Sequence, residues 1–314
     1  MRNWFEYAIV LVVRALVRLF PRWISLGIGD TLGWFFYLLY RRRRELAISN
    51  LRVAFPSRTE RQCREILQST FSHFGRHVVE LLIFTAVNID QTTNFIEIEG
   101  EEWVKQAMAQ GKGVMYYTGH FGYWELLLMV HALRFKPMIV VARTLDNPLL
   151  ERLMEKIRTR VGTRATPRHG AIRVLLKALM NNESVGMLID QHTQSSSSVM
   201  VDFLNRPAAT TSALAALALR TGAPVIPVFA LPLPGGSYRL IYESPVEPPA
   251  KNDPDPVRTY TQRCTNVLEK YVRQYPNLWL WMHRRWRVDA GGVGIDPKTA
   301  VVSPNTVVRK DVCP

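Results

Sequence analysis

The 314-residue sequence is poor in cysteine, and it lacks both internal repeats and a long uncharged hydrophobic run. Its three cysteines, Cys63, Cys264 and Cys313, are far apart, and none belongs to a C-x-x-C pair. An odd number of widely spaced cysteines argues against a disulfide framework and against a zinc site. The absence of a repeat with a period of about 20–50 residues argues against a solenoid or a propeller.

Acidic residues are also scarce, because 26 Asp and Glu stand against 40 Lys and Arg, for a net charge of +14. This balance predicts an acidic partner, which is a phospholipid surface, a nucleic acid, or an acidic protein or substrate. The charge alone does not choose among them. Hydrophobic residues make up 47% of the chain, which is therefore able to bury a sizeable core in one large domain or two small ones.

The first forty residues favour a membrane surface among these partners. Arg14 and Arg18 lie four residues apart on one face of a predicted helix, as in helices that lie in the membrane interface. Residues 24–40 approach the shortest membrane-crossing length but contain Asp30 and three glycines. Aromatic edges and the cluster Arg41–Arg44 predict attachment to the cytoplasmic leaflet. The alternative is a buried helical hairpin with a solvated basic end, whereas no small-residue site supports a cleaved signal peptide.

Beyond this region, helical periodicity gives way to alternating strands and helices. Apolar residues recur every three or four positions from residue 45 to about 95, interrupted by the turn PSRTE. Short apolar runs then predict strands at 113–118, 138–142, 184–190, 223–231 and 238–243. Helix-length segments lie between them at 121–134, 147–160, 170–181 and 209–221. The alternation predicts an α/β fold with helices on both faces of a sheet.

The stretch YYTGHFGYWELLL, residues 116–128, contains a candidate acid–base pair, His120 and Glu125. His120 follows a predicted strand, at the sheet edge where α/β proteins bind ligands. Within one regular helix the two side chains would point about 140° apart, so they meet only if His120 lies in a loop or first turn. A carboxylate on one imidazole nitrogen makes the other a better general base. The spacing alone is a weak signal, and a helix-capping histidine with an exposed glutamate is the alternative.

Six segments spread along the chain carry a resemblance to a known family. They are RRRRELAISNLRVAFP (41–56), TGHFGYWE (118–125), ARTLDNPLLE (142–151), GMLIDQHT (186–193), RPAATTSALAALALRTGAPVIPVF (206–229) and YPNLWLWMHRRWR (275–287). In this order they resemble the bacterial lipid A biosynthesis acyltransferases, the late lauroyl and myristoyl acyltransferases of the lysophospholipid acyltransferase superfamily. The resemblance implies a mixed sheet flanked by helices, as in glycerolipid acyltransferases.

The resemblance also implies an activity and its partners. The enzyme would move an acyl chain from acyl carrier protein, or from coenzyme A, to a hydroxyl of a lipid A precursor or related glycolipid. It would act at the bacterial inner membrane with its catalytic domain on the cytoplasmic side, and no metal or other cofactor is implied. The implied domains are membrane-binding helices at 1–44, an acyltransferase domain at 45–288 and a flexible C-terminal tail at 289–314.

Residue by residue, the resemblance implies two catalytic side chains. His120 and Glu125 fall on the family's H-x4-D/E pair, with His120 as the general base and Glu125 as the group that orients it. Arg143 resembles an arginine that contacts an anionic acceptor, with a surface salt bridge as the alternative. Arg158 and Arg160 resemble a basic pair of the same role, with a solvated helix face as the alternative.

Asp190 and Gln191 end a strand-like run, where polar groups face the site. The family usually has a second acid soon after, whereas this sequence has His192, and this difference leaves the type of acceptor open. The serines at 195–198 are interpreted as a polar loop, because no G-x-S-x-G motif accompanies them. The HRRWR segment at 283–287 is interpreted as contacting lipid headgroups or packing over the sheet, since no nucleic-acid-binding module is present.

Two other functions stay open at this point. The chain acylates another membrane lipid, such as a phosphatidylinositol mannoside or an aminolipid, or it is a non-catalytic membrane-surface protein that binds lipid. The intact pair of His120 and Glu125 speaks against the second of these.

Overall fold

The computed structural model describes residues 1–84, 95–193 and 198–286. The chain begins with four helices, α1 (Arg2–Leu19), α2 (Arg22–Leu39), α3 (Arg41–Ala54) and α4 (Glu60–Phe84). Pro21 separates α1 from α2, because a proline pushes the residue before it out of the helical conformation, and Phe20 is extended. The helical region predicted from residue 45 to about 95 is confirmed as α3 and α4 up to Phe84, and the part at 85–94 lies outside the described residues.

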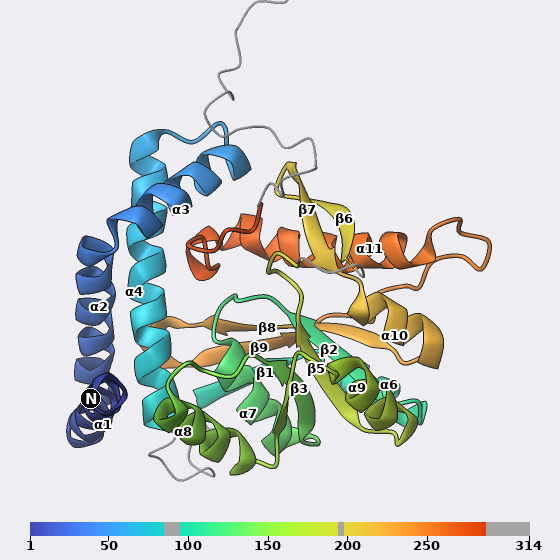
Figure 1. Ribbon diagram of the computed structural model, residues 1–314, viewed down its shortest axis with the longest axis horizontal. Coiled ribbons are helices and arrows are strands. Elements are labelled where there is room, and N and C mark those ends of the chain that lie inside the picture. The colour runs from blue at the N-terminus through green and yellow to red at the C-terminus, as the bar shows by residue number, and fades with distance from the viewer. Residues whose placement is uncertain (85–94, 194–197, 287–314) are drawn as a thin grey trace, which may run out of the picture.

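A seven-stranded sheet forms the centre of the molecule (Figure 1). Its strands lie in the order β1 (Ile96–Glu99), β9 (Tyr238–Tyr242), β8 (Val225–Pro232), β2 (Val114–Thr118), β5 (Ser184–Leu188), β3 (Met138–Ala142) and β4 (Arg164–Pro167). All neighbouring pairs are parallel except β8 and β9, so the sheet is mixed, as expected. Because β2 and β5 are parallel neighbours, the residues that follow them meet at one edge of the sheet.

Helices cover both faces of this sheet. They are α6 (Glu101–Ala109), α7 (Trp124–Arg134), α8 (Pro148–Thr159), α9 (Ala171–Met180), α10 (Ala213–Thr221) and α11 (Pro256–Gln274). Residues of β2 alternate between the two resulting cores. Met115 and Tyr117 pack with α3, α4, α9, α10 and α11, whereas Val114 and Tyr116 pack with α6, α7 and α8. Burial on both faces explains why all but the last residue of β2 are apolar or aromatic.

Helix α2 packs along α4, whereas α1 turns away at Pro21 and lies crosswise near the lower end of both helices (Figure 1). The two consecutive helices are called the α1–α2 hairpin below. A β-carbon at Gly33 or Gly75 would overlap the backbone of the facing helix, so the two backbones are in contact there. Asp30 accepts two hydrogen bonds of 2.6 Å from Arg76 and one from Ser72, so the carboxylate that interrupts the apolar run is paired. No described helix combines the length and the apolar character that a membrane crossing requires.

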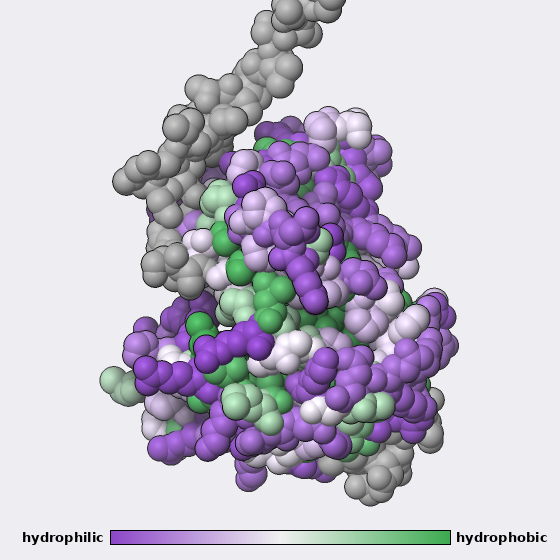
Figure 2. Space-filling view, turned by 90° about the vertical axis from the view of Figure 1, so that its right-hand side faces the viewer, coloured by the Kyte–Doolittle hydropathy of each residue, from purple (hydrophilic) through white to green (hydrophobic). Residues whose placement is uncertain are grey.

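The outer side of this hairpin carries large exposed hydrophobic side chains. They are Trp4, Phe5, Ile9, Val12, Leu19, Phe20, Trp23, Trp34, Phe35, Phe36 and Leu39. The opposite side of the molecule, over α6, α9 and α10, is mainly hydrophilic with scattered apolar residues (Figure 2). Of the two alternatives for the N-terminal region, the buried hairpin is wrong, because one side of α1 and α2 stays exposed, and attachment to a membrane stays a prediction.

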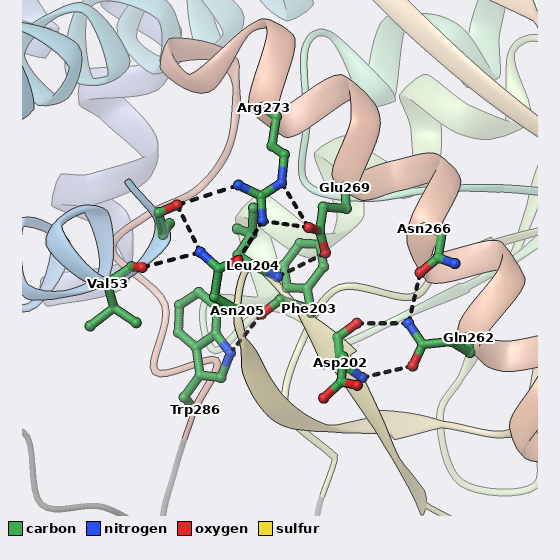
Figure 3. Close-up of polar contacts among 11 residues, drawn as sticks. Val53, Asp202, Phe203, Leu204, Asn205, Gln262, Asn266, Glu269, Arg273 and Trp286 are labelled. Carbon is green, nitrogen blue, oxygen red and sulfur yellow. Dashed lines mark hydrogen bonds and ion pairs between the residues drawn. The ribbon is translucent and has the colours of Figure 1, made fainter. Parts of the chain in front are cut away.

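A two-stranded antiparallel hairpin, β6 (Ser198–Phe203) and β7 (Arg206–Thr211), stands outside the main sheet. Figure 3 shows how its tip is tied to α3 and α11. The Asn205 side chain donates to the carbonyl oxygens of Val53 and Ala54, at 3.4 and 3.2 Å, and accepts from Arg273 at 3.0 Å. The helix predicted at 209–221 begins only at residue 213, because its first residues complete β7.

Candidate active site

His120 lies in the loop between β2 and α7, as the sequence predicted, and both of its backbone polar groups are bonded. Its N–H donates to Oδ2 of Asp190 at 2.8 Å, and its carbonyl accepts from the N–H of Leu280 at 3.1 Å. Gly122 has φ +57°, and a β-carbon there would overlap the carbonyl oxygen of Ala230, so only glycine fits. The loop therefore holds His120 in one place before α7 begins at Trp124.

Asp190, which follows β5, lies directly behind the imidazole. Its Oδ1 accepts from Nδ1 of His120 at 2.8 Å, and its Oδ2 also accepts from the indole N–H of Trp279 at 2.8 Å. The Asp190 side chain is only 2% exposed. Burial by itself raises the pKa of Asp190, but the charge of His120 and the three donated hydrogen bonds outweigh burial and lower the pKa to about 2. Asp190 is thus a buried anion.

A second chain of contacts fixes the proton on His120. Arg168 donates to Oε1 of Gln191 at 3.0 Å, and Nε2 of Gln191 lies 3.1 Å from Nε2 of His120. A guanidinium can only donate, so the amide oxygen of Gln191 faces Arg168 and its NH₂ faces the imidazole. The imidazole Nε2 must then accept, which leaves the ring proton on Nδ1, facing Asp190. His120 therefore has its lone pair at Nε2, where the Gln191 amide contacts it.

The predicted contact between Glu125 and His120 is wrong, because Glu125 bonds to another residue. Glu125 accepts from Arg158 of α8, at 2.7 Å from Nη2 and 3.4 Å from Nε, with the two side chains 15% and 11% exposed. Among the described residues, the ring of His120 bonds to Asp190 and Gln191. The reason is topological, because the parallel ends of β2 and β5 bring Asp190 to the ring, while the first turn of α7 directs Glu125 to α8.

The remaining predicted residues fall in different places. Arg143 pairs with Asp146 at 2.8 Å with both side chains largely exposed, which is the surface salt bridge that formed the alternative. Arg160 is an exposed residue at the end of α8. Asp190 is buried and contacts Nδ1 of the His120 ring, and Gln191 contacts Nε2. Residues 195–197 and the tail at 289–314 lie outside the described residues.

Two residues that hold the partners of His120 in place, Trp279 and Arg168, were not predicted from the sequence. Trp279 lies in a segment that carries the resemblance, but nothing in the sequence shows that its indole reaches Asp190. Arg168 gives no sequence signal at all.

In the HRRWR segment, Arg285 is buried and donates to the carbonyl oxygen of Ala209 at 2.6 Å and to Thr210. Arg285 therefore packs against the β6–β7 hairpin.

An aromatic wall completes the site beside His120. The rings of His120 and Trp124 lie 5.3 Å apart, and Trp124 stacks in turn on His77 of α4 at 4.1 Å. Burial lowers the pKa of His77 to about 3, with smaller contributions from His73 and His120. His77 is thus an uncharged part of the wall, and it takes no part in proton transfer near neutral pH.

Comparison with known proteins places this geometry in context. Residues 1–288 match the family model described as bacterial lipid A biosynthesis acyltransferase. The chain is 28% identical to the lipid A biosynthesis lauroyltransferase of Escherichia coli strain K12, over 93% of this chain and 94% of the relative. It is 26% identical to the lipid A biosynthesis palmitoleoyltransferase of the same strain, over 83% and 84%. It is 21% identical to the phosphatidylinositol mannoside acyltransferase of Mycolicibacterium smegmatis, over 72% and 73%.

Proposed function

The chain belongs to the bacterial lipid A biosynthesis acyltransferase family and is an acyltransferase, and on this premise we propose its donor, acceptor and mechanism. The donor is a fatty acyl thioester of acyl carrier protein, and the acceptor is a hydroxyl of a lipid A precursor. The observation that carries the proposal is the imidazole of His120, which has its lone pair at Nε2, beside the Gln191 amide, and the buried anion Asp190 on Nδ1.

In this mechanism His120 is the general base. The acceptor hydroxyl takes the place of the Gln191 amide at Nε2, and its proton moves to Nε2 as its oxygen attacks the thioester carbonyl. Asp190 stabilises the imidazolium that forms and keeps the ring in position. When the tetrahedral intermediate collapses, the carbon–sulfur bond breaks and the imidazolium returns the proton to the leaving thiolate. The products are the acyl ester and the free thiol of the carrier, with no acyl group left on the protein.

Glu125 serves a different group in this mechanism. Its carboxylate holds Arg158, whose side chain is 11% exposed and therefore partly shielded from water. We assign Arg158 to the negative charge that develops on the thioester oxygen, because a fixed cation in a poorly hydrated site stabilises such a charge strongly. Glu125 is then a positioning residue for Arg158.

Two further features support the proposed donor and location. A net charge of +14 complements an acidic carrier protein and favours its encounter with the enzyme. The exposed aromatic and aliphatic side chains of the α1–α2 hairpin, next to the arginines that begin α3, suit a membrane interface with anionic lipids. We propose that the protein sits on the cytoplasmic face of the bacterial inner membrane through this hairpin.

A second acceptor is favoured by one relative. The phosphatidylinositol mannoside acyltransferase aligns with most of this chain, and His192 stands where the lipid A enzymes usually have a second acid. A mannoside of phosphatidylinositol is therefore the second candidate acceptor. The chemistry at His120 is the same for both.

The test is acyl transfer by the purified full-length protein, with products identified by mass spectrometry. We expect acyl carrier protein thioesters to acylate a lipid A precursor faster than coenzyme A thioesters do, and the advantage to fall with salt, since exposed charges are screened over about 10 Å at 0.1 M. The variant His120→Ala should lose about 10²–10⁴-fold in turnover. The control variant His169→Ala, at an exposed histidine just before α9, should keep its turnover.

Three outcomes would contradict the proposal. One is a His120→Ala enzyme with near-normal turnover. Another is a stable acyl adduct in the intact mass of the wild type after mixing with donor alone. The third is acylation of the phosphatidylinositol mannoside but not of the lipid A precursor, which would keep the mechanism and replace the acceptor.

A further inference from the structure

A groove of about 550 Å³ lies between α1 and α8, away from the imidazole of His120. Its inner wall includes Phe84 at the end of α4 and Met129 of α7. The Asn147 side chain holds the two outer helices together, because it donates to the carbonyl oxygen of Asn3 at 2.9 Å and to Glu6 at 2.8 Å. Asn147 is buried, so the groove is a fixed part of the fold. Its volume suits a small organic ligand.

Four cationic side chains line this groove, Arg14 from α1 and Arg152, Lys156 and Arg160 from α8 and its end, and none of its described lining residues is acidic. Arg152 and Lys156 of α8 lie four positions apart, so they share one helical face and repel one another. The Nε of Arg14 is buried and has no hydrogen-bond partner within the described residues. An unsatisfied buried donor and a row of like charges are both relieved by an anion.

The rest of the lining is apolar. Trp4 and Tyr7 of α1 face Leu153 and Ile157 of α8, so hydrocarbon can lie along the groove beside the cations. Trp4 is 67% exposed and belongs to the apolar outer side of the α1–α2 hairpin. The groove is therefore continuous with the surface that we assign to the membrane. A ligand that enters from that surface has an anionic part and a hydrocarbon part.

We propose that this groove binds the phosphate headgroup of an anionic membrane lipid. The phosphate lies among Arg14, Arg152, Lys156 and Arg160, and the first part of an acyl chain lies against Trp4 and Leu153. Arginine and lysine suit a phosphate, which offers several acceptor oxygens to their donors. His120 does not line this groove, and lipid binding here requires no acyl transfer. A failure of the proposed function would therefore leave this binding site untouched, and the reverse also holds.

The test measures equilibrium binding to the full-length protein by calorimetry with three soluble probes. They are dihexanoyl phosphatidic acid, dihexanoylglycerol, which has the same chains without the phosphate, and inorganic phosphate. The groove variant is Arg152→Gln/Lys156→Gln. The matched control is Arg173→Gln/Lys177→Gln on α9, which removes an exposed arginine and lysine at the same four-residue spacing.

We expect the wild type and the control variant to bind phosphatidic acid equally and the groove variant to bind it about tenfold more weakly. We also expect dihexanoylglycerol and inorganic phosphate to bind more weakly than phosphatidic acid. Equal weakening by both double variants would show a general charge effect and overturn the site. Binding of inorganic phosphate as tight as that of phosphatidic acid, or of dihexanoylglycerol as tight, would overturn its assignment to a phosphate-bearing lipid.

Discussion

The position of one proton on His120 depends on which atoms of Asp190 and Gln191 face its ring. Oδ2 of Asp190 accepts from the backbone of His120 and from Trp279, so in the variant Asp190→Asn the amide oxygen should keep these two donors. The new NH₂ would then face Nδ1 and force the ring proton to Nε2, where no base is left. We expect turnover to fall by about 10⁴-fold with little change in KM, as for a wrong tautomer.

The informative comparison for this prediction is Glu125→Gln, measured in the same steady-state assay. Because Glu125 bonds to Arg158 and not to the ring, its amide should leave the tautomer intact, and turnover should fall less than in Asp190→Asn. The pH profile separates the two roles further, because only the Asp190 variant should lose the ionisation of a catalytic base. Equal losses and equal profiles would return the orienting role to Glu125.

For single residues, the sequence predicted where His120 lies but not which side chain its ring contacts. His120 could be placed because a buried apolar strand ends two residues earlier and glycines follow, and both signals are local. Asp190 is 70 residues away, and its contact with the ring depends on the pairing of β2 with β5, which periodicity does not reveal. Glu125 was the carboxylate nearest in sequence, and that proximity was misleading because helix α7 points it elsewhere.

The β6–β7 hairpin shows how a turn residue can hold several elements together. Asn205 has φ +64°, and its side chain bonds to the last carbonyls of α3 and to Arg273 (Figure 3). We expect Asn205→Ala to lower the free energy of unfolding by about 2–3 kcal/mol, because it loses these bonds and disfavours a positive φ. Asn205→Gly should lose about 1 kcal/mol less, since glycine accepts that φ. Urea unfolding measures both, and a glycine variant less stable than the alanine variant would contradict this account.

The elements that the sequence predicted are those with a strong local pattern. The strands β2, β3, β5 and β8 were predicted because each is a mainly apolar run, as in strands buried within a sheet. The strand β9, whose residues alternate between buried and half-buried, was predicted from the run YRLIY between turn residues. The strands β6 and β7 were missed, because SVMVDF and RPAATT are mixed in polarity and are stabilised by contacts with distant helices. The amphipathic pattern of α11 was present, with buried residues at 264, 268, 271 and 272, and it was overlooked.

The outer side of the α1–α2 hairpin carries the proposed attachment to the membrane. Trp23 and Trp34 of α2 are 74% and 61% exposed and lie eleven residues apart, on one helical face. We expect Trp23→Ser/Trp34→Ser to weaken binding to vesicles that contain phosphatidylglycerol, because two interfacial anchors are lost. The matched control is Ile172→Ser/Met180→Ser on α9, which removes two exposed apolar side chains from the hydrophilic side. Vesicle flotation measures the bound fraction, and equal effects of the two variants would argue against the hairpin as the attachment.

For the whole molecule, buried histidines make stability depend on pH. Burial lowers the pKa of His73 to about 4, and those of His77 and His131 to about 3. In the unfolded chain the ordinary pKa is about 6.5, so the unfolded state takes up protons first as the pH falls. The stability that these neutral rings contribute is present above about pH 6.5 and is lost below it. Asp190 does not change the stability between pH 7 and pH 5, because its pKa of about 2 places its titration at lower pH.

We expect the free energy of unfolding to fall between pH 7 and pH 5 by about 2 kcal/mol for each of these three histidines. The variant His131→Phe keeps a ring among Tyr116, Phe135 and Tyr242 but removes one titrating group, so its fall should be about 2 kcal/mol smaller than that of the wild type. The exposed His169 provides the control, and His169→Phe should fall as the wild type does. Urea unfolding at the two pH values gives each difference. If His131→Phe showed the full wild-type fall, the buried imidazole would not be the group that takes up the proton on unfolding.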